Sequence, residues 1–99
     1  MYLVGYLQPG EKNEAEMDAK IISPIPCQTG EEICLAVEKL CAAIDYDMDN
    51  FEPEIWDALK DVKYFDTNYV TIDLHGSPVL VDLIVGEENM LRKKFPIKE

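Results

Sequence analysis

The sequence predicts a small α+β domain with a mainly antiparallel sheet of about four strands. Two hairpins would form the sheet, two central helices would pack on one of its faces, and a short helix would follow near the C-terminus. Three observations favour this arrangement: short runs rich in β-formers near both ends, two amphipathic stripes at helical spacing between them, and a length of 99 residues with 47% hydrophobic content. We expect residues 1–99 to form a single domain.

The first hairpin is predicted from residues 2–7 and 17–23. Residues 2–7 are apolar β-formers, and Pro9-Gly10 after them is typical of a turn. Gly5 in the middle of the first strand indicates a bulge or a close approach of another backbone. Pro24 and Pro26 then predict an extended connector to the first helix.

The first helix has a clear start, because the segment 29–32 reads Thr-Gly-Glu-Glu and fits a capping box. Thr29 would accept from a backbone N–H of the first turn, and Glu32 would reach back to the cap. One apolar stripe follows at helical spacing, formed by Ile33, Val37, Leu40, Cys41 and Ile44.

The second helix is predicted to begin at Pro53, because proline is favoured at the first helical position. Phe51 and Trp56 then occupy the two positions of a hydrophobic staple. The apolar stripe of this helix consists of Ile55, Leu59 and Val62. Residues 45–50 between the helices are rich in Asp and Asn and are expected to form a loop.

The second hairpin is predicted from residues 69–74 and 79–85, joined by a two-residue Gly76-Ser77 turn of type II′. This register opposes Ile72 with Val81 and Val70 with Leu83, which gives one apolar face. The other face is mixed and contains Tyr69, Leu80 and Ile84. Residues 87–95 predict a short helix that ends before Pro96.

Acidic residues dominate the charge, with a net charge of −11 at pH 7. Residues 45–57 hold six acids and no base. Like charge at this density destabilises a compact chain, so a small domain that keeps it has a reason to do so. Phosphate would be repelled, which disfavours nucleic acid and anionic membranes as direct partners. A basic protein surface would be attracted.

The sequence lacks the patterns of catalytic and cofactor sites. It has no glycine-rich phosphate loop and no C-x-x-C pair, so we expect no cofactor and no metal site. Cys27, Cys34 and Cys41 form an odd set, typical of reduced thiols in a cytoplasmic protein. No signal peptide or membrane span is predicted. His75 is the one histidine, and a pairing with Cys27 or an acid is the enzyme alternative.

Two short segments resemble known families. The segment 45–50, Asp-Tyr-Asp-Met-Asp-Asn, resembles the opening of an EF-hand calcium loop, which implies a cation held by alternating carboxylates. Asn50 and Trp56 stand where that loop has Gly and a bidentate Glu. The segment 56–59, Trp-Asp-Ala-Leu, resembles part of the second helix of the barstar family of acidic nuclease inhibitors, without that family's Tyr-Gly-Asn lead-in. This resemblance implies that Asp57 contacts a basic enzyme.

The leading hypothesis is a non-enzymatic protein-interaction domain that docks on a basic surface and occludes it. The partner would be a nuclease or another nucleic-acid-binding protein, with this chain acting as an immunity or phage anti-defence inhibitor. The alternative is a self-associating structural or accessory subunit, a homodimer formed through the mixed sheet face or a free strand edge, whose acidity serves solubility. The expected partner-binding residues are Asp45, Tyr46, Asp47, Met48, Asp49, Glu52, Glu54 and Asp57.

Overall fold

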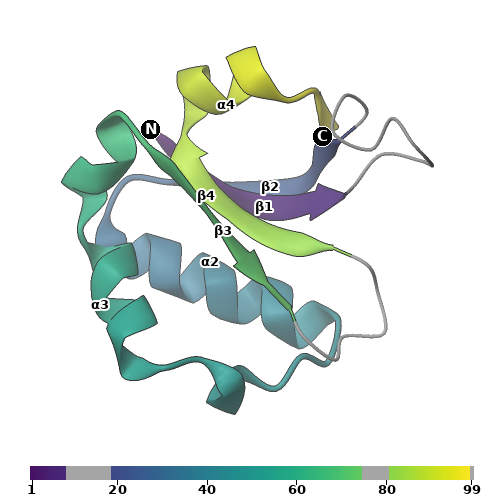
Figure 1. The fold of residues 1–99 in the computed structure, drawn as a ribbon, viewed down its shortest axis with the longest axis vertical. Helices are drawn as coiled ribbons and strands as arrows, with labels where there is room; N and C mark the ends of the chain where they lie inside the picture. Colours follow the sequence, from purple (N-terminus) through teal and green to yellow (C-terminus); the bar gives the residue numbers. More distant parts are fainter. Residues whose placement is uncertain (9–18, 75–80, 99) are drawn as a thin grey trace.

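The computed structural model describes residues 1–8, 19–74 and 81–98, which form one mainly antiparallel sheet with helices on both faces (Figure 1). The five strands of the described residues are β1 (Tyr2–Gln8), β2 (Lys20–Cys27), β3 (Tyr69–Asp73), β4 (Asp82–Glu87) and β5 (Ile97–Lys98). They lie in the order β3-β4-β1-β2-β5. The helices are α2 (Gly30–Ala43), α3 (Pro53–Lys60) and α4 (Glu88–Lys94), with 3₁₀ turns η2 (Met48–Asn50) and η3 (Val62–Asp66). The predicted α+β class is confirmed.

Apolar clusters cover both faces of the sheet. The larger cluster joins strand residues such as Val4 and Val85 to α2 and α3. These two helices therefore pack on the same face of the sheet, as expected. On the opposite face Leu91 of α4 is fully buried against Ile84, and both belong to a second cluster. Together the two clusters form a three-layer arrangement in which the sheet is the middle layer.

The central strand of the sheet is β1, which pairs antiparallel with β2 on one side and β4 on the other. Its register with β2 shifts between Val4 and Tyr6, which confirms the bulge predicted at Gly5. A Cβ added to Gly5 would lie 2.9 Å from Ile21 Cγ2 and 3.1 Å from the Ile22 carbonyl oxygen. Glycine is therefore required here by the close approach of β2.

The second strand is longer than predicted and includes both prolines. Pro24 and Pro26 were expected in a connector, yet β2 continues through them to Cys27, with Pro26 opposite Leu3. The reason is the short outer neighbour: β5 pairs with β2 only at Ile21 and Ile22. Beyond Ile22, β2 has no described neighbour on its outer side. A proline is tolerated there because the N–H group that it lacks would otherwise point to solvent.

The second hairpin has a different register from the predicted one. Ile72 opposes Leu83 and Val70 opposes Val85, a shift of two residues. An even shift keeps the same side chains on the core face, so the apolar pattern does not distinguish the two registers. In the same sheet Val85 also opposes Val4 of β1, so β4 is paired on both sides. The expected turn at 76–77 lies outside the described residues.

The predicted mixed face of this hairpin is not a free contact surface in the described residues. Ile84 is fully buried beneath α4 in the smaller cluster. The Tyr69 ring meets the Phe95 ring edge-on, with centroids 5.7 Å apart. Leu80 lies outside the described residues. The terminal segment that carries α4 and Phe95 covers this face because its apolar side chains have no other surface on which to be buried.

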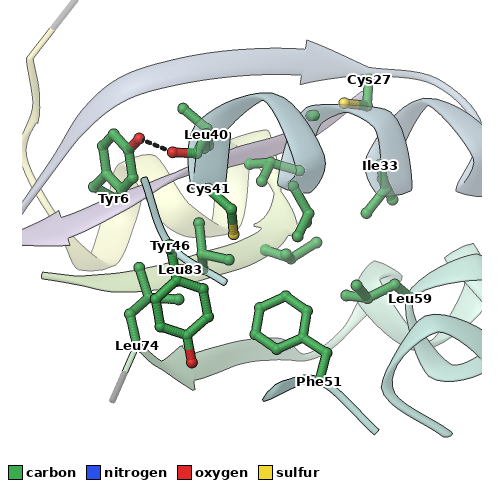
Figure 2. Packing of buried hydrophobic residues seen from close by; sticks show 14 of the residues in the cluster. Tyr6, Cys27, Ile33, Leu40, Cys41, Tyr46, Phe51, Leu59, Leu74 and Leu83 are labelled. Atoms are coloured by element: carbon green, nitrogen blue, oxygen red, sulfur yellow. Dashed lines mark hydrogen bonds between the residues drawn. The ribbon is translucent and has the colours of Figure 1, made fainter. Parts of the chain in front are cut away.

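Local capping fixes the position of α2. The Glu32 N–H donates to the Thr29 hydroxyl at 3.2 Å, and the Glu32 carboxylate accepts from the Gln28 N–H at 3.1 Å. The predicted capping box is thus present, with the reach-back made one residue earlier. At the other end the buried Tyr6 hydroxyl donates to the Leu40 carbonyl, as Figure 2 shows. This bond ties the last turn of α2 to the central strand.

A glycine sets the contact between α2 and α3. A Cβ added to Gly30 would lie 2.6 Å from the Lys60 Cα, so the backbone at the end of α3 touches the start of α2. The other end of α3 begins at Pro53, as predicted. There the Phe51 and Trp56 rings meet with centroids 5.5 Å apart, which confirms the staple.

Replacement of Gly30 tests this contact. Gly30→Ala should lower the free energy of unfolding by about 1–3 kcal/mol, because the new methyl group must push the Lys60 backbone away. Urea denaturation followed by Trp56 fluorescence measures the change. Helix propensity alone predicts the opposite sign, since alanine favours a helix over glycine. A variant as stable as the parent, or more stable, would show that the contact does not constrain α3.

Candidate functional site

The six acids of residues 45–57 form one exposed region, called here the acidic surface: Asp45, Asp47, Asp49, Glu52, Glu54 and Asp57. All six side chains are exposed. An ion pair in the described part of the chain joins Arg92 to Glu88 at 3.1 Å and lies in α4. Among the described residues, no lysine or arginine pairs with any carboxylate of the acidic surface. Its negative charge therefore faces solvent without a paired base among the described residues.

Backbone interactions hold the loop of the acidic surface in place. The Asp47 carboxylate accepts from the Asp49 N–H at 2.9 Å and caps η2. Asp45 adopts a positive φ of 56°, a conformation that Asp tolerates better than most residues. Its N–H donates to the Ala42 carbonyl at 3.2 Å, at the end of α2. These acids are thus turn formers as well as charges.

The EF-hand-like spacing does not produce a cation site in the residues that the structure describes. No group of three or more His, Cys, Asp or Glu side chains converges there as a metal would require. The acids of the loop instead take separate positions around η2, with Asp47 turned back to its own backbone. A calcium ion needs six or more oxygen ligands gathered on one point.

Tyr46 is a core residue rather than an exposed anchor. Its side chain is 8% exposed, and its ring lies 5.6 Å from that of Phe51. Figure 2 shows the two rings side by side beneath α2. Met48 is half-buried against the same cluster. Of the expected partner-binding residues, Tyr46 therefore attaches the loop to the core.

A groove of about 850 Å³ lies between α3 and strand β3. It is the size of a small-ligand or peptide site. Two of the expected partner-binding residues, Tyr46 and Glu52, line it, and the other six do not. The remaining lining residues come from η2, α3, η3 and β3: Asn50, Phe51, Ile55, Ala58, Leu59, Asp61, Tyr64, Phe65, Val70, Thr71, Ile72 and Asp73.

The groove is negatively charged. Its lining residues in the described chain include Glu52, Asp61 and Asp73 and no base. Glu54 and Asp57 share a helix face with Ala58 and Asp61, because positions i, i+3, i+4 and i+7 align on a helix. The acidic surface therefore continues along α3 to the border of the groove. The sequence did not predict this groove, because it depends on α3 and β3 being neighbours; the acids Glu54, Asp57 and Asp61 along α3 were the one feature of it visible in the sequence.

The cysteines behave as core groups. Cys27 and Cys41 are buried, and burial raises the pKa of each thiol from 9.0 to about 11. They are protonated at neutral pH, and a protonated thiol is a poor nucleophile. Cys34 is half-buried and also has a raised pKa, chiefly through burial. His75, the candidate for the enzyme alternative, lies outside the described residues.

The raised thiol pKa values predict an alkaline loss of stability. The unfolded thiols release protons above pH 9 while the folded ones hold them until about pH 11, so the free energy of unfolding should fall across this interval. Urea denaturation at pH 8, 9 and 10 measures the slope. A Cys27→Ala, Cys41→Ala variant should be less stable but should have a shallower slope. An equal slope in both proteins would contradict the assignment.

No family model, curated protein or solved structure matches this chain. The two short resemblances in the sequence therefore carry no family assignment. Within the described residues, no helix has the length and apolar character needed to cross a membrane.

Proposed function

We propose that this chain is a non-enzymatic protein-interaction domain that docks its acidic surface on a basic partner and occludes it. One observation carries the proposal: six carboxylates within thirteen consecutive residues are all exposed, and no lysine or arginine of the described chain forms an ion pair with them. This arrangement costs folding free energy through self-repulsion. A cationic partner would remove that repulsion on binding and would be steered to the acidic surface from a distance.

The partner class follows from charge chemistry. Proteins that bind nucleic acids present basic surfaces shaped for phosphate, and an acidic protein surface competes for the same sites. An inhibitor of a nuclease or of another nucleic-acid-binding protein, of immunity or anti-defence type, is the function that fits. The three free thiols, Cys27, Cys34 and Cys41, suit a reducing compartment such as the cytoplasm.

A second candidate is self-association, in which the acidity serves solubility. The observation that favours it is the edge strand β3, which is hydrogen-bonded only to β4 among the described strands. Two copies could pair through such edges. Sedimentation of the purified chain separates the candidates, because a monomer at micromolar concentration removes this second one.

Charge reversal tests the proposed docking. Immobilised chain should capture a basic nucleic-acid-binding protein from a lysate of its host at about 50 mM salt and lose it at about 500 mM, since salt screens exposed charges. Asp49→Lys combined with Glu54→Lys should reduce this capture at least tenfold. Neither side chain forms a hydrogen bond with another described residue, whereas Asp47 caps η2 and is left in place.

The matched control is Glu31→Lys combined with Glu38→Lys. It changes the net charge by the same amount at two exposed positions on α2, outside the acidic surface. Capture by this control should stay within about twofold of the parent, apart from the general effect of net charge. Equal losses in both variants would mean that only overall charge matters, and unchanged capture by the first variant would refute the docking.

A further inference from the structure

The groove lies beside β3, the terminal strand of the sheet in the part of the chain that the structure describes. It is lined by four consecutive residues of β3, from Val70 to Asp73. Successive side chains of a strand point to opposite faces, so contact with four residues in a row fits a hollow that follows the edge of the strand. The opposite wall is formed by α3 and η3, through Ile55, Ala58 and Tyr64 among others.

The edge of β3 offers backbone hydrogen-bonding groups. In the sheet of the described residues, β3 is the terminal strand and pairs only with β4. In an antiparallel ladder every second residue directs its N–H and C=O away from its partner strand. Over the five residues of β3, about 17 Å long, these groups point away from β4 at the edge of the strand beside the groove. A second extended chain could pair with them.

Apolar side chains complete the groove. Val70 and Ile72 are half-buried on the same face of β3, and Ile55 is half-buried on α3. Tyr64 is 49% exposed, which is high for an aromatic side chain next to a core. An extended segment that pairs with β3 would place every second side chain among these residues. Its other side chains would lie toward solvent and the acidic border.

The charges of the groove lining indicate which kind of chain the groove would bind. Glu52 and Asp61 line the groove, and none of its lining residues in the described chain is a base. A second copy of this chain, with a net charge of −11, would bring like charge to an acidic border. Its basic cluster Arg92, Lys93 and Lys94 lies in helix α4 and is not extended. A cationic segment of another protein is complementary.

We infer that the groove binds an extended segment of the basic partner, in which Lys or Arg alternates with aliphatic residues, by adding it as a sixth strand beside β3. The inference rests on the proposed function and names how part of the partner would be held. The main chain of the segment would supply hydrogen bonds, its aliphatic side chains would fill the groove, and its basic side chains would pair with the border acids.

Synthetic peptides test the inference directly. The probe is an acetylated and amidated heptapeptide of sequence Lys-Val-Lys-Val-Lys-Val-Lys, titrated into the ¹⁵N-labelled full chain. We expect saturable amide shifts at residues 69–73 and around Ile55 and Tyr64. The same peptide with alternate amides N-methylated keeps its charge but cannot pair as a strand, and it should bind at least tenfold more weakly. A Glu-Val counterpart should not bind.

A variant that fills the groove is the second test of the inference. Ala58 is exposed and lines the groove, so Ala58→Trp should fill it without disturbing the core and weaken the heptapeptide at least tenfold. The matched control is Ala42→Trp, at an exposed α2 position outside the groove, which should bind as the parent does. The amide spectrum and urea midpoint of each variant show whether it remains folded.

Several results would overturn the inference. These are the absence of heptapeptide binding at millimolar concentration, equal binding of the N-methylated peptide, or a dimer of the free chain that Ala58→Trp dissociates, which would make a second copy the occupant. The proposed function fails separately. If charge reversal on the acidic surface abolishes partner capture while Ala58→Trp leaves it intact, docking stands and strand addition is wrong. If charge reversal has no effect, docking itself is wrong.

Discussion

The close approach of Gly30 to the Lys60 backbone determines where α3 lies, and the acidic surface and the groove both depend on that position. A larger residue at 30 would separate the two helices by the width of a side chain. The glycine places the end of α3 against the start of α2, which itself packs on the sheet. From there α3 and η3 reach back toward β3 and leave a hollow at the sheet edge instead of covering it.

Aromatic packing opposes the charge repulsion in this region. The rings of Tyr46, Phe51 and Trp56 follow one another at centroid distances of 5.6 and 5.5 Å, and Tyr46 and Phe51 are buried. These contacts attach the loop and the start of α3 to the core. The exposed acids that repel one another belong to the same segment of the chain. Burial of large rings contributes more than exposed like charges cost at moderate ionic strength. The acids can therefore remain unpaired without unfolding the segment.

Features with local causes were predictable from the sequence. Thr29 and Glu32, Pro53, and the Phe51–Trp56 staple act within a few residues, and each is where the sequence placed it. Features set by distant partners were not predictable. The register of Ile72 could not be chosen because two registers put the same side chains on the core face, and Pro26 fits in β2 only because β5 is short. The groove likewise requires that α3 and β3 be neighbours, and of its acids only Glu52 was among the expected partner-binding residues.

The central position of β1 has a consequence for how the chain folds. Its partners in β4 lie about 80 positions away along the chain, as for Val4 and Val85, so the middle of the sheet closes through long loops. Folding through such distant pairings is slow, and strands are left unpaired while it proceeds. The net charge of −11 keeps partly folded copies apart during this interval. The same acidity that would attract a basic partner thus protects the molecule from aggregation before its fold is complete.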